Sequence, residues 1–297
     1  MTVQLSAGEI DHFNEHGYVG PFSLLETDVA DTLRERIFDE ILTRRSATYE
    51  HTEGNPERVS RTRDRHLDSP LMYRIASLPG IVGRVSSLLG PDVLLWRSDI
   101  FAQGSADPVT PPHQDVDISG TLVIPCIEAT SAAATLFVLE RPTGNVALPL
   151  CVTAWMTFSQ VRAETGALWV VPGTHRAVVP EVPGEGIGGR PTKLARTFTP
   201  ADGRVLEMRA GEFILFHNLL VHGSMPVREG RRLAWNTRHV APQTRIYPRG
   251  SINAQGQDLS RFGSLIVSGS PHVHSNVLRA PPSVGIGSLV DELAIAE

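Results

Sequence analysis

The sequence predicts a mainly β-fold, a sandwich or barrel, with a helical cover at its N-terminal end. Two amphipathic helical patterns lie within the first 41 residues, and from Val93 onward short apolar or alternating runs are separated by Gly, Pro and Asp. Many short strands that follow N-terminal helices are typical of a sandwich or barrel. The 297 residues, 41% hydrophobic and 20% charged, suffice for one domain with a substantial core.

The two predicted helices have recognisable starts and apolar faces. Ser6 and Glu9 have the spacing of a capping box, and Ile10 and Phe13 follow on one face. A second helix is expected to begin at Thr27, because apolar residues then recur every four positions, at Val29, Leu33, Ile37 and Ile41. Gly17, before Tyr18 and Val19, predicts the break between the two helices.

Residues 53–69 are polar and rich in arginine, with no sustained apolar period, and therefore predict a loop. A solvated basic surface is favoured over a lid that reaches for an anionic substrate. The arginines concerned are Arg58, Arg61, Arg63 and Arg65.

Eight later runs predict strands because they are short, apolar or alternating, and bounded by turn residues. They cover residues 93–102, 121–127, 135–139, 146–158, 167–171, 204–208, 212–216 and 233–240.

Composition narrows the classes of partner. The formal net charge of −5 argues against nucleic acid, and no apolar run approaches the roughly 18 to 20 residues that span a bilayer. The N-terminus lacks the basic start and apolar centre of a secretory signal, which predicts a cytoplasmic location. Cys126 and Cys151 lack the spacing of a zinc site or disulfide framework, so we expect reduced, buried thiols.

His113 and Asp115 form the first part of a candidate metal site. In an extended segment these two side chains point to the same face and can grip one ion. By itself the His-x-Asp triplet is weak evidence for a metal site. Such triplets occur by chance, and an exposed His-Asp pair is usually an ordinary part of the surface. A third ligand, His222, follows a later strand, and two imidazoles with one carboxylate are the set associated with iron(II) oxygenases. His217 is the competing third ligand, although it lies inside the predicted strand, before the turn.

Such an oxygenase also needs a cation for the far carboxylate of 2-oxoglutarate, and arginine binds carboxylates in a bidentate manner. Arg232 lies ten residues after His222, at the start of a strand whose alternation places Ala234, Asn236 and Arg238 on the same face. Without the metal ligands, Arg231 and Arg232 would be interpreted as solvated charges at a turn.

At this point the sequence resembles the phytanoyl-CoA dioxygenase family, in the branch that contains the non-haem iron chlorinating enzymes. The motifs include Pro112-His113-Gln114-Asp115, Pro172-Gly173-Thr174-His175-Arg176 and His222-Gly223-Ser224. The resemblance covers roughly residues 1–250, in the segments 5–10, 16–19, 95–99, 112–115, 166–176, 210–213, 222–226, 232–238 and 245–248.

The resemblance implies a double-stranded β-helix, also called a cupin-like jelly roll, with His113, Asp115 and His222 as iron(II) ligands. It also implies 2-oxoglutarate as co-substrate, bound by Arg232 with help from Ser224, with Arg231 as the alternative arginine. Dioxygen is the oxidant, and ascorbate serves as reductant in vitro. His175 lies in a turn that looks structural in relatives. The single oxygenase domain would comprise a cover at 1–90, a jelly-roll core at 91–248 and a C-terminal extension at 249–297.

Asp115 determines the expected outcome of the reaction. Chlorinating relatives carry a small residue at this position, which leaves room for chloride, so the carboxylate favours hydroxylation of a small metabolite or natural-product intermediate. Desaturation, cyclisation or rearrangement by the same chemistry, or a jelly roll that binds metal or ligand without turnover, remain alternatives. The helices, the arginine-rich loop and residues 116–145 are expected to roof the pocket.

Overall fold

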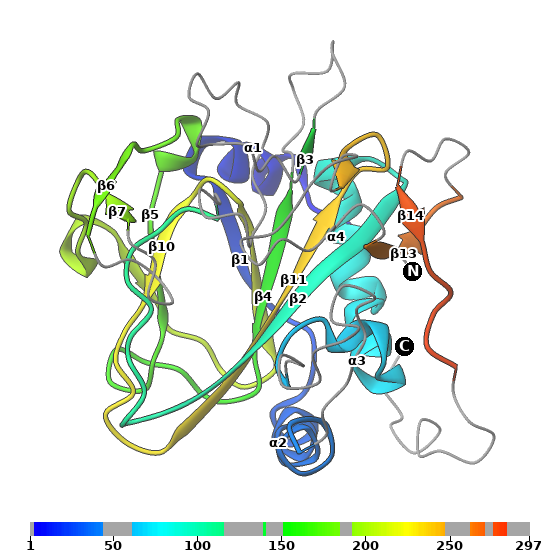
Figure 1. Ribbon diagram of the computed structural model, residues 1–297, viewed down its shortest axis with the longest axis horizontal. Coiled ribbons are helices and arrows are strands. Elements are labelled where there is room, and N and C mark those ends of the chain that lie inside the picture. The colour runs from blue at the N-terminus through cyan, green and yellow to red at the C-terminus, as the bar shows by residue number, and fades with distance from the viewer. Residues whose placement is uncertain are drawn as a thin grey trace.

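A seven-stranded sheet forms the centre of the computed structural model, which describes residues 3–43, 61–115, 139–140, 151–184, 192–246, 262–270 and 276–283 (Figure 1). Strand β11 lies in the middle of this sheet and pairs antiparallel with β2 and β4. In sheet order the strands are β1 (Tyr18–Ser23), β9 (Glu212–His217), β4 (Val152–Thr157), β11 (Arg231–Val240), β2 (Val93–Gly104), β13 (Gly263–Ser268) and β14 (Val277–Leu278).

A smaller sheet faces the inner side of the large one, at the left of Figure 1. It consists of β10 (Val221–Ser224), β5 (Leu168–Val171) and β8 (Arg204–Leu206). Trp155, Ile214 and Ala234 of the large sheet share one buried apolar cluster with Leu168 and Val170 of the small one. Two short pairs complete the strands, β3 (Leu139–Glu140) with β12 (Arg245–Ile246) and β6 (Glu181–Pro183) with β7 (Thr192–Leu194).

Helices cover the outer side of the large sheet. Strand alternation turns Leu233 and Trp235 of β11 outward, where they share a cluster with Leu33 and Ile75 of the helices. The helices are α1 (Ala7–His16), α2 (Thr27–Arg36) with its π-helical continuation Ile37–Ile41, α3 (Pro70–Ala76) and α4 (Pro79–Leu89). Single 3-10 turns occupy Arg65–Leu67, Thr174–Arg176 and Pro200–Asp202.

The capping box at Ser6 and Glu9 is confirmed, and the second helix begins at Thr27 as predicted. Gly17 does end the first helix, in a left-handed conformation with φ of 83°, but the next element along the chain is strand β1 and not a second helix. Residues 1–90 therefore contribute a strand to the sheet as well as a cover, because β1 pairs with β9.

Five of the eight predicted strands are confirmed in kind, with shifted ends, as β2, β5, β8, β9 and β11. The predicted run at 146–158 contains β4, and residues 146–150 lie outside the described residues, as do 121–127, 135–138 and Cys126. Cys151 is buried and unpaired, as expected. Within the described ranges, no helix combines the length and the apolar character needed to cross a membrane.

Candidate metal centre

The segment after β2 presents His113 and Asp115 to the space between the sheets. His113 forms an isolated antiparallel bridge with His222 of β10, through N–H to carbonyl hydrogen bonds of 2.9 and 3.0 Å. The Asp115 N–H donates to the Asn218 carbonyl at 2.8 Å. Gln114, between them, is buried on the other side and donates through Nε2 to the carbonyls of Leu219 (2.6 Å) and Ala177 (2.8 Å). The expected alternation is therefore present.

Three donor atoms, one each from His113, Asp115 and His222, all lie within 4.8 Å of one another. Both imidazoles are oriented by a hydrogen bond from Nδ1 to the backbone carbonyl two residues earlier in the chain. Nδ1 of His113 donates to the Pro111 carbonyl and Nδ1 of His222 to the Leu220 carbonyl, each at 2.9 Å. Since a carbonyl only accepts, each Nδ1 carries a proton, which makes Nε2 the ring nitrogen that can bind a metal.

Electrostatics favour the protonation states that a metal requires. Burial, followed by the neighbouring His113, lowers the pKa of His222 to about 3, so its imidazole is neutral. Burial alone would raise the pKa of Asp115, but the Arg238 guanidinium together with the neighbouring His113 and His222 outweighs it, so the pKa lies well below its ordinary value. A neutral imidazole and an ionised carboxylate are the forms that coordinate metals.

His217, the competing third ligand, and His175 of the nearby turn are not members of this cluster. His217 ends β9, and its Nδ1 accepts a hydrogen bond from the Leu219 N–H at 3.0 Å. His175 packs against His217, with ring centroids 5.3 Å apart, and its Nε2 lies 3.2 Å from the Asn14 carbonyl. A Cβ on Gly17 would come within 2.5 Å of the His175 ring, so His175 lies against the junction of α1 and β1.

Arg231 and Arg232 point to opposite sides of β11. Arg231 is exposed, with its guanidinium 4.0 Å from the centre of the Phe38 ring. Arg232 is only 3% exposed and donates through Nη1 to the Gly166 carbonyl at 2.5 Å and through Nη2 to Oε1 of Gln103. Its Nε has no partner among the described residues, and burial lowers its pKa to about 10.

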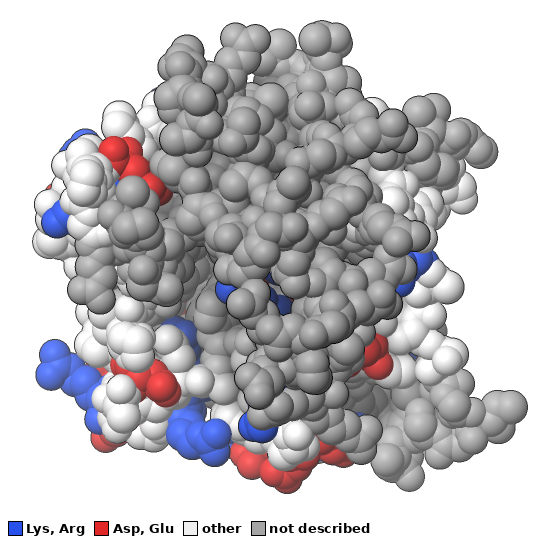
Figure 2. All heavy atoms as spheres, viewed as in Figure 1, with Lys and Arg blue, Asp and Glu red and all other residues white. Residues whose placement is uncertain are grey.

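Arg232 is thus a buried cation that meets only neutral acceptors in the described part of the chain. Such a charge is costly unless an anion completes it. Figure 2 shows that some Lys or Arg atoms are visible near the centre of the face viewed in Figure 1. Ser224 lies on β10 two residues after His222 and is buried, and its hydroxyl accepts the Thr110 N–H at 2.9 Å.

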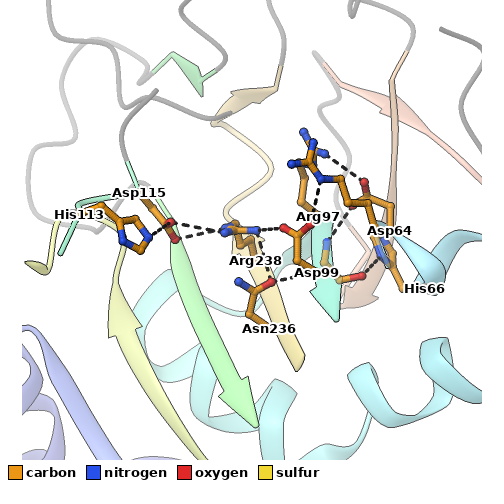
Figure 3. Close-up of polar contacts among 10 residues, drawn as sticks. Asp64, His66, Arg97, Asp99, His113, Asp115, Asn236 and Arg238 are labelled. Atoms are coloured by element: carbon orange, nitrogen blue, oxygen red, sulfur yellow. Dashed lines mark hydrogen bonds and ion pairs between the residues drawn. The ribbon is translucent and has the colours of Figure 1, made fainter. Parts of the chain in front are cut away.

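A second buried arginine, Arg238, contacts the candidate metal ligand itself (Figure 3). Its Nε and Nη2 lie 3.3 and 3.4 Å from the two carboxylate oxygens of Asp115, and its Nη1 lies 2.7 Å from Asp99. Strand alternation predicts that Arg238 shares a face with Arg232, but no sequence spacing predicts these two carboxylate partners, because they come from separate segments.

Comparison with known proteins supports the fold. The phytanoyl-CoA dioxygenase (PhyH) family model matches residues 13–233. Peroxisomal phytanoyl-CoA dioxygenase of Rattus norvegicus is 26% identical over 161 residues, which are 52% of this chain and 40% of the relative. The chain spans less than half the length of the curated relatives it matches.

Two solved structures have the same fold at low identity. CytC3 with Fe(II) and alpha-ketoglutarate is 22% identical with a TM-score of 0.64, covering 94% of each chain. The apo non-heme monooxygenase ThoJ is 18% identical with a TM-score of 0.67, covering 92% of this chain and 87% of its own. With the two facing sheets, these likenesses confirm the predicted double-stranded β-helix with a helical cover.

Proposed function

The chain belongs to the phytanoyl-CoA dioxygenase (PhyH) family, and we propose that it is an iron(II)- and 2-oxoglutarate-dependent dioxygenase that hydroxylates an unactivated C–H bond of a small metabolite or natural-product intermediate. One observation carries the proposal. The fold contains both a cluster of two imidazoles and one carboxylate and a buried arginine, Arg232, that lacks a carboxylate partner among the described residues. The first feature suits a metal, and the second suits a carboxylate-bearing co-substrate.

His113, Asp115 and His222 would hold the iron. Two imidazoles and one carboxylate on one side leave further coordination positions open, which is the ligand set of iron(II) oxygenases and differs from a closed tetrahedral zinc site. When bound, iron(II) and 2-oxoglutarate would supply the oxidising chemistry, with dioxygen consumed and succinate and carbon dioxide released. The chain itself orients the donors, keeps Asp115 ionised and limits the access of water.

Arg232 would bind the far carboxylate of 2-oxoglutarate. Its burial and its unpartnered Nε support this role, whereas Arg231 is solvent-exposed over Phe38. Arg238 is a weaker candidate, because two carboxylates of the chain already occupy its donors. Ser224 would assist through its hydroxyl proton, since its oxygen accepts from Thr110 and leaves that proton to donate.

Hydroxylation is favoured over halogenation because of Asp115. Its carboxylate, in the metal cluster, would occupy the position that chloride needs. Desaturation, cyclisation and rearrangement would use the same residues and differ only in the fate of the substrate. A jelly roll that binds metal without turnover is the alternative of a different class.

The test measures conversion of 2-oxoglutarate to succinate by purified protein with iron(II) and ascorbate. We expect slow conversion without substrate, and faster conversion with a metabolite extract that also yields a product heavier by one oxygen atom. The matched controls are His222→Ala in the proposed site and His217→Ala outside it. Absence of succinate from the native protein, with iron bound and extract present, would favour the non-catalytic alternative.

A further inference from the structure

We infer that Arg238 is the positioning residue that fixes the orientation of the Asp115 carboxylate before any metal binds. The inference rests on the proposed function, since it takes Asp115 as a metal ligand. It adds a role for a side chain that neither holds the metal nor binds the co-substrate.

The contacts of Arg238 engage both oxygens of Asp115. Nε lies 3.3 Å from Oδ2 and Nη2 lies 3.4 Å from Oδ1, so the guanidinium fork faces the carboxylate edge to edge (Figure 3). A bidentate arginine–carboxylate pair fixes the plane of the carboxylate as well as its position. The Asp115 N–H, bonded to the Asn218 carbonyl at 2.8 Å, fixes the backbone at the same residue. Rotation of the Asp115 side chain is therefore restricted both at its carboxylate and at its backbone.

Arg238 is itself held by the large sheet. Its Nη1 donates to Asp99 at 2.7 Å and lies 3.3 Å from Oδ1 of Asn236, which precedes it by two residues on the same face. Asn236 is paired in register with Asp99 of β2, and its Oδ1 also accepts the Asp99 N–H at 2.9 Å. Arg63 lies 3.4 Å from the other Asp99 oxygen. Charges of alternating sign thus run from Arg63 through Asp99 and Arg238 to Asp115.

The contrast with Arg232 separates the two buried arginines of β11. Arg232 meets a carbonyl and an amide oxygen and keeps one N–H unpartnered, whereas Arg238 meets two carboxylates, which raise its pKa above the ordinary value despite burial. A guanidinium saturated by carboxylates of its own chain has little capacity left for an external one. Its function is therefore internal, and of its two carboxylate partners Asp115 is the one in the proposed metal site.

Hydrogen bonds to a metal-ligating carboxylate typically change metal affinity by about 10- to 100-fold when they are removed. We expect Arg238→Met to weaken cobalt(II) binding to the protein, without co-substrate, within that range. Arg238→Lys, which keeps a point charge but not the fork, should fall between Met and the native protein. The visible absorption of bound cobalt(II) reports both affinity and coordination geometry, independently of turnover.

The matched control is Arg97→Met. Arg97 is buried, is paired in register with Arg238 on the neighbouring strand and forms an ion pair with Asp64 at 3.2 Å. This substitution removes a comparable buried cation that has Asp64, and not Asp115, as its carboxylate partner. We expect it to lower stability while leaving cobalt(II) affinity within about threefold of native, a range well below the effect of a lost ligand contact. Equal weakening by Arg97→Met and Arg238→Met would overturn the inference.

A rescue experiment tests the contact without depending on the stability of Arg238→Met alone. In Asp115→Gly the Arg238 fork loses its carboxylate, so added formate should restore part of the cobalt(II) affinity at constant ionic strength. The rescue should disappear in Asp115→Gly combined with Arg238→Met, or shrink when Lys replaces Arg238. Undiminished rescue in these double variants would refute the role of Arg238. His222→Ala distinguishes failure of the Arg238 inference from failure of the proposed metal site. Native cobalt(II) affinity in that variant would refute the metal site itself.

Discussion

Replacing Arg232 by Met should reduce the affinity for 2-oxoglutarate by about one to two orders of magnitude. The prediction follows from the surroundings of this side chain, which is 3% exposed and, among the described residues, donates to the Gly166 carbonyl and the Gln103 amide oxygen and lies 5.8 Å from the centre of the Trp155 ring, with no carboxylate partner. A carboxylate arriving there would find a cation already stripped of water and held in place.

The magnitude can be estimated in two ways. A hydrogen bond to a charged group contributes about 1.5 to 3 kcal/mol, which corresponds to roughly 10- to 150-fold in affinity. Independently, burial lowers the pKa of Arg232 to about 10, which corresponds to roughly 3 kcal/mol of uncompensated desolvation in the unliganded protein. A bound carboxylate would recover part of this cost. Arg232→Met should therefore cost little stability in the unliganded protein, or raise it.

The assay is an anaerobic titration of 2-oxoglutarate into the iron(II)-loaded protein, followed by the visible charge-transfer band of the chelate. Arg231→Met is the matched control, because it removes an adjacent arginine that is exposed over Phe38. Chemical denaturation without ligand provides the second measurement. A large affinity loss in Arg231→Met with none in Arg232→Met would refute the assignment, and so would a stability loss in Arg232→Met that accounts for the whole effect.

Three further predictions concern the metal ligands and one buried acid. His222→Ala should abolish cobalt(II) binding and turnover with the fold retained, while His217→Ala keeps metal affinity; the reverse result would transfer the third ligand to His217. Asp115→Gly should be mostly inactive with at best traces of chlorinated product by mass spectrometry, and chlorinated product as the main outcome of the native enzyme would mean that Asp115 is not a ligand. Burial raises the pKa of Asp64 to about 7. The folded state therefore binds more protons than the unfolded state between about pH 4 and 7. The free energy of unfolding of the native protein should fall as pH rises through that window. Urea denaturation should show Asp64→Asn gaining stability relative to native from pH 5 to pH 8; a constant difference would contradict the raised pKa.

The predicted and missed elements differ in how much of their structure is local. The helix at Thr27 and strands such as β9 and β11 follow from apolar period, which each segment carries by itself. Strand β1 is missing from the sequence-based expectation, and its own sequence argues against a strand, because Gly20 and Pro21 lie in its middle and proline is excluded from central strands. The structure accommodates both residues at the edge of the sheet, where β1 has β9 as its one neighbour among the described strands and its register shifts between Val19 and Phe22.

Helix α4 illustrates a second reason for a missed element. Its sequence contains the β-branched residues Ile81, Val82 and Val85 and the internal Gly83, all of which have weak helix propensity. Tertiary packing outweighs that propensity, since Ile81, Val85 and Leu88 are buried in the apolar cluster between the helices and the outer side of the large sheet. Pro79 at the helix start and Gly90 after its end are the local signals that were available.

At the site, the local geometry of His113 and Asp115 could be predicted because two residues on one face of an extended segment need no other information. The two buried arginines of β11 could not be distinguished in this way. Arg232 and Arg238 share a face and a strand, and sequence alternation treats them alike. The register between β11 and β2 distinguishes them. It sets Gln103 opposite Arg232 and Asp99 opposite Asn236, and Asp99 lies within reach of Arg238. Asp115 then approaches Arg238 from 123 residues away along the chain. One arginine is therefore neutralised by its own chain while the other has no carboxylate partner among the described residues, and strand register, which no single segment encodes, determines which is which.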